Sequence, residues 1–186
     1  MNIIIIGKPG SGKGTQAKTL SKKCHLYHFS TGDYFRKEMH LGTELGKRVE
    51  HILKTPTLIS DDLVNEIAKK VIKEKNHENI VFDGYPRTII QAKFLDKYLK
   101  HPVDHVISLE VSDETALKRQ HDRQKRSQRE DSTSIEKLKS RLKVFQGMTV
   151  PLIEFYKEKN LLHIVDGEPD IKTIAKEIEK IVKCPQ

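Results

Sequence analysis

The stretch Ile3-Ile-Ile-Ile-Gly7-Lys-Pro-Gly10-Ser-Gly12-Lys13-Gly14-Thr15 decides the fold of this chain. Its four isoleucines form a short apolar run of the kind that becomes a buried β-strand. The segment that follows has the spacing Gly-x4-Gly-Lys, which is typical of a phosphate-binding loop. Glycines let several backbone N–H groups point at one oxyanion, and a following helix adds the positive end of its dipole. The sequence therefore predicts a strand, a phosphate loop and a helix, with Lys13 as a mobile charge for the outer phosphates.

Length and composition are those of one globular α/β domain. The chain has 186 residues, of which 32% are charged and 36% hydrophobic. No apolar run approaches the roughly 20 residues that a membrane helix needs, and no basic leader precedes the first predicted strand. Cys24 and Cys184 have no metal-binding or redox spacing, so we expect free thiols. The prediction is a cytoplasmic protein without a membrane partner.

Positive charge is concentrated in one segment. The formal net charge is +8. Between Leu117 and Lys143 there are ten Lys or Arg residues and four acidic residues, a surplus of six positive charges. Such a field implies an anionic partner, either nucleic acid or the phosphates of a nucleotide.

Candidate strands alternate with helical patterns along the chain. The strands are expected at Ile3–Ile6, Leu26–Phe29, Ile80–Asp83, His105–Val111 and Leu161–Val165. This alternation favours an α/β fold with a parallel sheet covered by helices on both faces. Ser60-Asp61-Asp62 offers helix caps, and Pro151 should kink or restart the helix around it. The polar stretches near 30–59 and 118–133 are expected to be excursions from one core.

A second motif, His28-Phe29-Ser30-Thr31-Gly32-Asp33-Tyr34-Phe35-Arg36, comes at the end of the second predicted strand. The carboxyl ends of parallel strands are where α/β proteins bind ligands. Thr31 offers a hydroxyl there, and Arg36 offers a fork for a second phosphate. Taken alone, such a segment is also a common helix start.

The third motif, Asp83-Gly84-Tyr85-Pro86-Arg87-Thr88, follows the third predicted strand. An acid at a strand end beside a phosphate loop is a natural partner for Mg²⁺, usually through its water ligands. Arg87 can clamp phosphate. Gln91, one turn into the next helix, can read a base edge with its amide, which both donates and accepts hydrogen bonds.

Four arginines form the last chemical signal. Phosphoryl transfer needs positive charge at oxygens that neither a lysine nor Mg²⁺ covers. Arginines on a mobile segment can arrive after the substrate and exclude water as they do so. The candidates are Arg119, Arg123, Arg129 and Arg141.

Together these motifs resemble the adenylate kinase family, within the nucleoside monophosphate kinases. The resemblance covers essentially the whole chain and includes Thr149-x-Pro-Leu-Ile153 and Asp166-Gly167. The family's phosphate loop ends in Lys-Gly-Thr, as it does here at Lys13. The resemblance implies a P-loop NTPase-type core with a five-stranded parallel sheet, a small helical AMP-binding insertion and a short lid. Their expected extents are 1–29, 60–117 and 134–186 for the core, 30–59 for the insertion and 118–133 for the lid.

The resemblance also implies a role for individual residues. ATP would contact Gly10, Ser11, Gly12, Lys13, Gly14, Thr15, Arg119, Arg123 and the backbone of Glu168. AMP would contact Thr31, Arg36, Thr57, Leu58, Ile59, Gly84, Tyr85, Pro86, Arg87, Gln91, Arg129 and Arg141. The catalytic set would be Lys13, Arg87, Arg123, Arg129 and Arg141. Asp83 would hold Mg²⁺ through water.

The implied reaction is the reversible, Mg²⁺-dependent transfer of a phosphoryl group from ATP to AMP, giving two ADP. The acceptor phosphate is anionic at neutral pH, so no general base is expected. Relatives imply a monomer, and the short lid lacks the cysteines that hold structural zinc in some long-lid forms. Some positions differ from the usual family pattern: Gln128 replaces Gly, Ser132 replaces an acid and Tyr85 replaces Phe.

Two other functions remain open from the sequence. A UMP/CMP kinase could use the same scaffold, but that family usually has Ala at the position of Thr31 and Asn at that of Thr88. A nucleic-acid-binding protein that uses ATP as a switch would explain the basic segment. That segment is poor in the Phe and Tyr side chains on which bases stack, so we predict no nucleic-acid partner.

Overall fold

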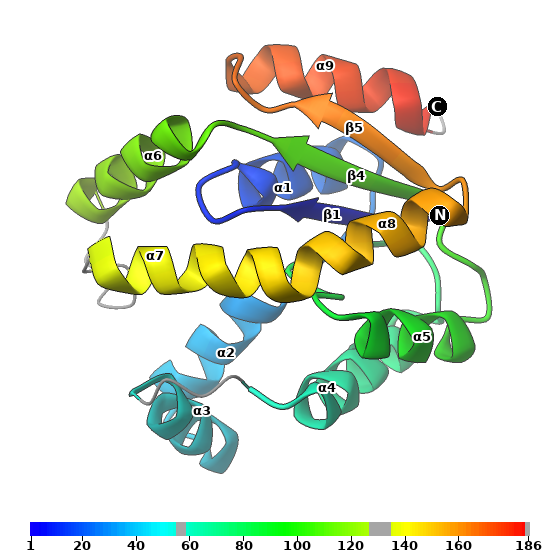
Figure 1. Cartoon of the computed structure of the whole chain (residues 1–186). Helices are drawn as coiled ribbons and strands as arrows, with labels where there is room; N and C mark the ends of the chain where they lie inside the picture. Colours follow the sequence, from blue (N-terminus) through cyan, green and yellow to red (C-terminus); the bar gives the residue numbers. More distant parts are fainter. Residues whose placement is uncertain (55–58, 127–134, 185–186) are drawn as a thin grey trace.

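The protein is described by a computed structural model that covers residues 1–54, 59–126 and 135–184 (Figure 1). In these residues five parallel strands form one sheet in the order β2-β3-β1-β4-β5. The strands are β1 (Asn2–Gly7), β2 (Tyr27–Ser30), β3 (Ile80–Asp83), β4 (His105–Glu110) and β5 (Leu162–Asp166). All five predicted strands are confirmed, with ends shifted by one residue at most.

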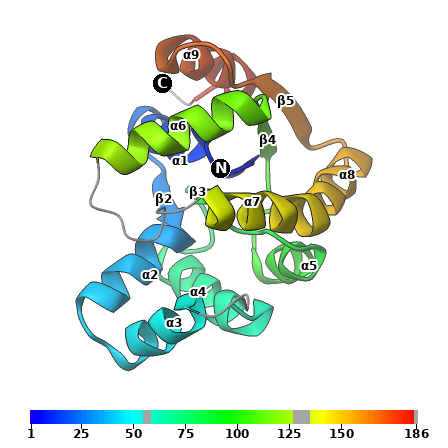
Figure 2. The same ribbon diagram turned by 60° about the vertical axis from the view of Figure 1, so that its left-hand side comes forward.

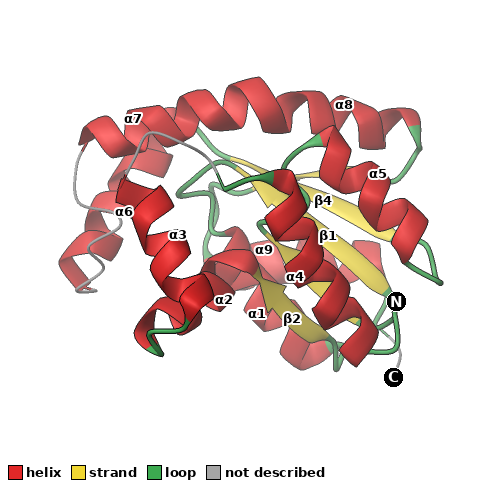
Figure 3. Cartoon of the chain, turned by 90° about the horizontal axis from the view of Figure 1, so that it is seen from below, coloured by secondary structure: helices red, strands yellow, loops and turns green. Residues whose placement is uncertain are grey.

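The isoleucines of β1 supply both faces of the sheet, because side chains alternate along a strand. Ile3 and Ile5 pack with α1 (Lys13–Lys23) and α9 (Ile171–Val182). Ile4 and Ile6 pack on the other face, which is covered by helices seen in Figure 3: α4 (Asp61–Glu74), α5 (Ile89–Tyr98) and α8 (Val150–Glu158). The central strand is thus buried on both sides, and the predicted three-layer α/β fold is confirmed.

Helices α2 (Thr31–His40) and α3 (Glu44–Lys54) lie side by side outside these layers, as Figure 2 shows. The Ser30 hydroxyl caps α2 by accepting a hydrogen bond from the backbone N–H of Asp33. The pair comes directly after β2 and occupies most of the segment expected to form the insertion. The second motif is therefore both a helix start and part of the carboxyl edge of the sheet.

Helix α6 (Asp113–Arg126) follows β4, and α7 (Ile135–Val144) continues through a π-helical turn (Phe145–Thr149) into α8. Pro151 lies in the first turn of α8, where its missing N–H is tolerated. The predicted restart of this helix is thus confirmed. The first half of the expected lid belongs to α6, and residues 127–134 lie outside the described residues. Within the described helices, none is long and apolar enough to cross a membrane.

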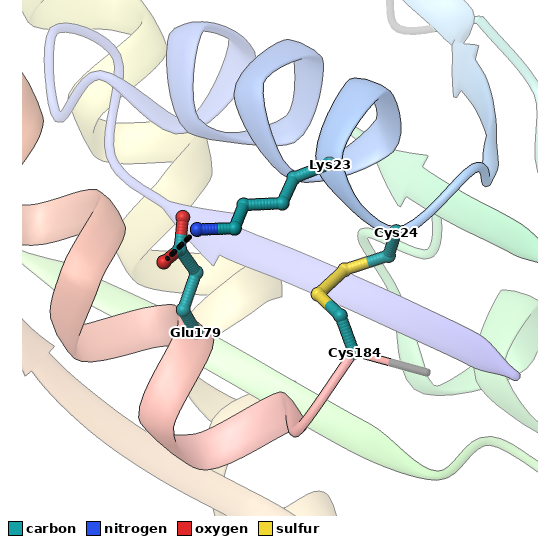
Figure 4. Close-up of a disulfide and its surroundings, with 4 residues drawn as sticks. All are labelled: Lys23, Cys24, Glu179 and Cys184. Atoms are coloured by element: carbon teal, nitrogen blue, oxygen red, sulfur yellow. Dashed lines mark hydrogen bonds and ion pairs between the residues drawn. A yellow bond between two sulfur atoms is a disulfide. The ribbon is translucent and has the colours of Figure 1, made fainter. Parts of the chain in front are cut away.

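The expectation of free thiols is wrong. Cys24, at the end of α1, and Cys184, just after α9, form a disulfide with Cα atoms 5.0 Å apart (Figure 4). Lys23 and Glu179 add an ion pair of 2.6 Å between the same two helices. The cysteines are 160 residues apart in sequence, so no local spacing could signal the bond. Only the packing of α9 on α1 brings them together.

Candidate active site

The phosphate loop presents a helix N-terminus without a side-chain cap. Gly10 and Gly12 have φ values of 94° and 91°, which only glycine adopts without strain. Gly12 precedes α1 and offers no side chain to its first N–H groups. These N–H groups and the helix dipole are suited to an anion. The buried Ser11 hydroxyl, without a hydrogen-bond partner among the described residues, lies in the same loop.

Gly14 is explained by its distance from β3. A Cβ atom at this position would lie 3.1 Å from Oδ2 of Asp83, closer than most real contacts. The missing side chain lets the first turn of α1 approach the acid at the end of β3. The phosphate loop and the motif that begins at Asp83 are thereby held in direct contact.

Lys13 lies among charged side chains of both signs. We call Lys13, Asp83, Arg87, Arg123 and Arg141 the charged cluster. Loss of solvent contact lowers the pKa of Lys13 to about 8; Asp83 opposes this shift, and the charges of the three arginines add to it. Three of the predicted catalytic arginines therefore lie within electrostatic reach of Lys13, and the fourth, Arg129, lies outside the described residues.

The carboxylate of Asp83 remains ionised although it is only 8% exposed. Burial by itself would raise its pKa, but contact with His28 and the charges of Lys13 and Arg87 hold that pKa below its usual value. Nε2 of His28 lies 3.5 Å from Oδ2 of Asp83. An ionised carboxylate beside a phosphate loop fits Mg²⁺ bound through water. No cluster of three His, Cys, Asp or Glu side chains suited to a metal occurs in the described residues.

The loop after β3 joins two of the predicted AMP contacts. Gly84 has a φ of 76°, and its carbonyl accepts hydrogen bonds from Oγ1 of Thr31 at 3.0 Å and Nε of Arg87 at 2.8 Å. The Thr149 hydroxyl donates to the carbonyl of Arg87 at 3.3 Å. The peptide bond between Tyr85 and Pro86 is cis. The ends of β2 and β3 thus hold Arg87 at the carboxyl edge of the sheet.

The other predicted AMP contacts lie in different surroundings. Nη2 of Arg36 donates to Oδ1 of Asp33 at 2.5 Å, so its guanidinium is held near the start of α2. Ile59 packs against the hydrophobic core. Thr57 and Leu58 lie outside the described residues.

Gln91 belongs to a buried hydrogen-bonded set that we call the amide network. Its side chain is 4% exposed. Its Nε2 donates to Oδ1 of Asp61 at 2.7 Å, and its Oε1 accepts from the backbone N–H of Arg87 at 2.7 Å. The Thr88 hydroxyl donates to Oδ2 of Asp61 at 3.1 Å and accepts from the backbone N–H of Gln91 at 3.1 Å. The members of this network are Asp61, Asn65, Tyr85, Thr88 and Gln91.

Tyr85 and Asn65 complete the amide network. The Tyr85 hydroxyl donates to Oδ1 of Asn65 at 2.8 Å, and both side chains are buried. The phenolic oxygen therefore has a partner inside the protein. Sequence reasoning took Asp61 only as a helix-capping residue and did not single out Asn65. Their spacing of four residues, on one face of α4, was the available signal.

The predicted ATP contacts of the lid side divide into two groups. Arg119 donates to the carbonyls of Gly167 at 2.7 Å and Glu168 at 3.0 Å, so it binds the loop after β5. The Glu168 carboxylate accepts from the backbone N–H of Ser112 at 2.6 Å and from the Thr115 hydroxyl at 2.7 Å. These bonds hold the pKa of Glu168 below its usual value. Arg119 and Glu168 thus lie together at the loop after β5. Arg123 instead lies close enough to Lys13 for its charge to lower the pKa of that lysine.

Comparison with known proteins identifies the family of this chain. A family model described as "Adenylate kinase" matches residues 5–161. An adenylate kinase of Thermosipho melanesiensis is 36% identical, over 98% of this chain and 100% of that protein. One from Prochlorococcus marinus subsp. pastoris is 38% identical, over 98% of both chains, and one from Porphyromonas gingivalis is 39% identical, over 98% of this chain and 95% of that protein. The chain belongs to the adenylate kinase family.

The site residues fall into three sets. The charged cluster lies beside the phosphate loop. Thr31 and Gln91 both bond to the loop after β3, and Arg119 and Glu168 lie together at the loop after β5. Asp61 and Asn65 are polar neighbours of these residues, and His28, from the second motif, contacts Asp83.

Proposed function

We propose that this protein transfers the terminal phosphoryl group of ATP to AMP, reversibly, giving two ADP. The observation that carries the proposal is the charged cluster: Lys13 of the phosphate loop lies within electrostatic reach of three arginines and of the ionised carboxylate of Asp83. Such a site gains most from a ligand rich in negative charge. Two nucleotides that meet at their phosphates provide that charge.

Alignment and charge supply the catalysis. The N–H groups of the phosphate loop and the α1 N-terminus would hold the ATP phosphates, and Lys13 would bind the outer ones. Arg87 would orient the AMP phosphate, and Arg123 and Arg141 would stabilise charge on the transferred group. Holding both groups for in-line attack can contribute about 7–11 kcal/mol. The AMP phosphate oxygen is already anionic, so the mechanism needs no general base.

Magnesium would join this site with its nucleotide. Asp83 would hold it through water, and Mg²⁺ would neutralise charge on the ATP phosphates. The low pKa of Asp83 supports this role, because the carboxylate stays ionised at neutral pH. The fixed position of Asp83 against Gly14 would place the ion beside the loop.

Thr31 and Gln91 would favour AMP over other acceptors. Gln91 carries an amide that can both accept from and donate to the adenine edge. We further propose that the protein acts as a monomer in the cytoplasm, with nucleotides as its partners and no nucleic acid among them. Size-exclusion chromatography of the purified protein tests the first point.

The decisive test is ADP formation from ATP with each of AMP, CMP, UMP and GMP, with and without Mg²⁺. We expect fast, Mg²⁺-dependent turnover with AMP alone. A preference for CMP or UMP would replace the proposed acceptor with that of a UMP/CMP kinase. If folded protein transfers phosphate to none of them, the proposal is wrong, and salt-sensitive binding of RNA or DNA would then support the nucleic-acid alternative.

A further inference from the structure

The orientation of the Gln91 amide is fixed from two sides. Its Nε2 faces a carboxylate oxygen of Asp61, which only accepts hydrogen bonds, and its Oε1 faces the backbone N–H of Arg87, which only donates. A turn of the amide by 180° would place two donors against each other and two acceptors against each other. Because Gln91 is 4% exposed, water could not repair those contacts.

The orientation matters because an amide and a purine edge are both directional. Oε1 retains a second lone pair, and Nε2 retains a second N–H. Adenine offers an amino donor at C6 beside an acceptor at N1. Hypoxanthine, which is nearly identical in shape, offers an acceptor at C6 beside a donor at N1. The two bases therefore present opposite patterns to the same amide, and turning that amide would exchange their preferences.

We propose that Asp61 is a specificity-determining residue of this enzyme, which acts by holding the Gln91 amide in the orientation that matches 6-aminopurine. Asp61 need not touch the nucleotide. It positions Gln91, and the proposal rests on AMP being the acceptor.

Asp61 is itself held in place. Its Oδ2 accepts a hydrogen bond from the Thr88 hydroxyl at 3.1 Å, while its Oδ1 accepts from Gln91. Thr88 is the N-cap of α5, and Asp61 is the first residue of α4, so the carboxylate joins the starts of two helices. One turn further along α4, Asn65 accepts from Tyr85. Polar groups on this face of α4 thus support the segment 85–91 at two successive turns.

The test measures kcat/KM for AMP and for IMP, with ADP and IDP separated by chromatography. In Asp61→Leu, the loss of the acceptor frees the amide to turn. We expect the ratio of kcat/KM for AMP to that for IMP to fall about tenfold and the KM for AMP to rise, while the KM for ATP stays unchanged. Because a merely structural defect would lower activity with both acceptors together, it would leave the ratio intact.

Two variants control this measurement. Asp61→Asn keeps an oxygen for Gln91 and can donate its new N–H to the Thr88 hydroxyl, so it should retain the ratio within about threefold. Asp62→Leu changes the exposed neighbour in the same helical turn and should leave the ratio and both KM values unchanged. If Asp61→Leu does not fold, Asp61→Ala removes the same acceptor with a smaller side chain.

The outcomes separate this proposal from the reaction on which it rests. If the wild-type protein transfers no phosphate to AMP, the proposed function is wrong. Wild-type protein that uses AMP, with an AMP-to-IMP ratio that Asp61→Leu leaves unchanged, would overturn the role of Asp61 alone. A fall of the ratio in Asp61→Asn as large as in Asp61→Leu would also overturn it, because the orienting oxygen would then be irrelevant.

Discussion

The charged cluster and the amide network share the segment from Gly84 to Gln91, but they satisfy their polar groups in opposite ways. Side chains of the amide network bond to one another and to nearby backbone, so each of them has a hydrogen-bond partner without a ligand. The charged cluster holds four basic side chains and one acid, and the loss of solvent with the repulsion from neighbouring arginines lowers the pKa of Lys13 to about 8. An added anion would stabilise the cluster and leave the network unchanged.

This difference matches the two tasks of a nucleotide kinase. Discrimination between bases requires donors and acceptors in fixed positions, and a satisfied buried network supplies them. Phosphoryl transfer requires charge that becomes stabilising only when phosphate arrives. Changes in the charged cluster should therefore affect turnover most, and changes in the amide network should affect specificity and stability.

The largest effect should follow the loss of a cation from the charged cluster. Lys13→Ala and Arg87→Ala should each lower kcat about 10²–10³-fold or more, because each removes charge at the transferred phosphate. Steady-state assays of purified variants measure this. Circular dichroism should show that both remain folded.

Lys22→Ala is the matched control, since Lys22 is an exposed cation on the same helix as Lys13. It should retain wild-type turnover. A folded Lys13→Ala variant with wild-type turnover would remove that residue from the mechanism and contradict the contrast between the two regions.

Local signals were enough to predict the charged cluster and the sheet. Each of these signals is contained in a few consecutive residues: the Ile3–Ile6 run, the motifs at the strand ends and Pro151. Ends of parallel strands meet at one edge, so residues that follow them are brought together by the fold itself. The lack of a side chain at Gly14 is explained by the nearby carboxylate of Asp83.

The amide network and the disulfide could not be predicted in this way. The bonds of Asp61 to Thr88 and Gln91 span 27 and 30 residues, and an acid in the first turn of a helix is already explained as a cap. The disulfide spans 160 residues. Both depend on how helices pack, and periodicity in a sequence shows only which face of a helix is buried.

The second largest effect should come from the disulfide, which lies at the end of α1 away from the phosphate loop. Removing a disulfide enlarges the ensemble of the unfolded chain and destabilises a protein by about 2–4 kcal/mol. Reduction, or Cys184→Ser, should therefore lower the Tm by roughly 5–15 °C in a chain of this size. Calorimetry with and without dithiothreitol measures the difference.

Turnover at 25 °C should stay within twofold after reduction, because the bond touches neither the charged cluster nor the amide network. In Cys184→Ser the reducing agent should have no further effect on the Tm. An equal Tm for the wild-type protein with and without dithiothreitol, with both thiols shown to be free in the untreated sample, would contradict the bond.

A smaller effect should follow Tyr85→Phe in the amide network. The variant leaves Oδ1 of Asn65 buried without its donor, which should lower the free energy of unfolding by about 1–2 kcal/mol. Urea unfolding measures this. Adding Asn65→Leu removes the orphaned group and should recover most of the loss. If the double variant is as unstable as the sum of the single ones, the two side chains are not coupled.

The smallest effect concerns the stability of the charged cluster without nucleotide. The pKa of Lys13 is about 8 in the folded protein, against 10.5 for an ordinary lysine. Below about pH 8 the lysine is charged in both states, and the folded state bears an unfavourable charge. Lys13→Met should therefore stabilise the protein at pH 7, by about 1 kcal/mol because this side chain is only partly buried and the remaining solvent screens its charge, or roughly 2–4 °C in Tm.

The sign of the pH dependence distinguishes this electrostatic effect from better packing by methionine. Between about pH 8 and 10.5 the folded protein loses the proton of Lys13 before the unfolded chain does, so the stability of the wild type rises relative to that of the variant. The difference in stability between Lys13→Met and the wild type should therefore disappear as the pH approaches 10.5. Lys22→Met should show no such difference at any pH. A stability difference between Lys13→Met and wild type that stays constant across this range would mean that repulsion does not act on Lys13. The electrostatic contrast between the charged cluster and the amide network would then be wrong.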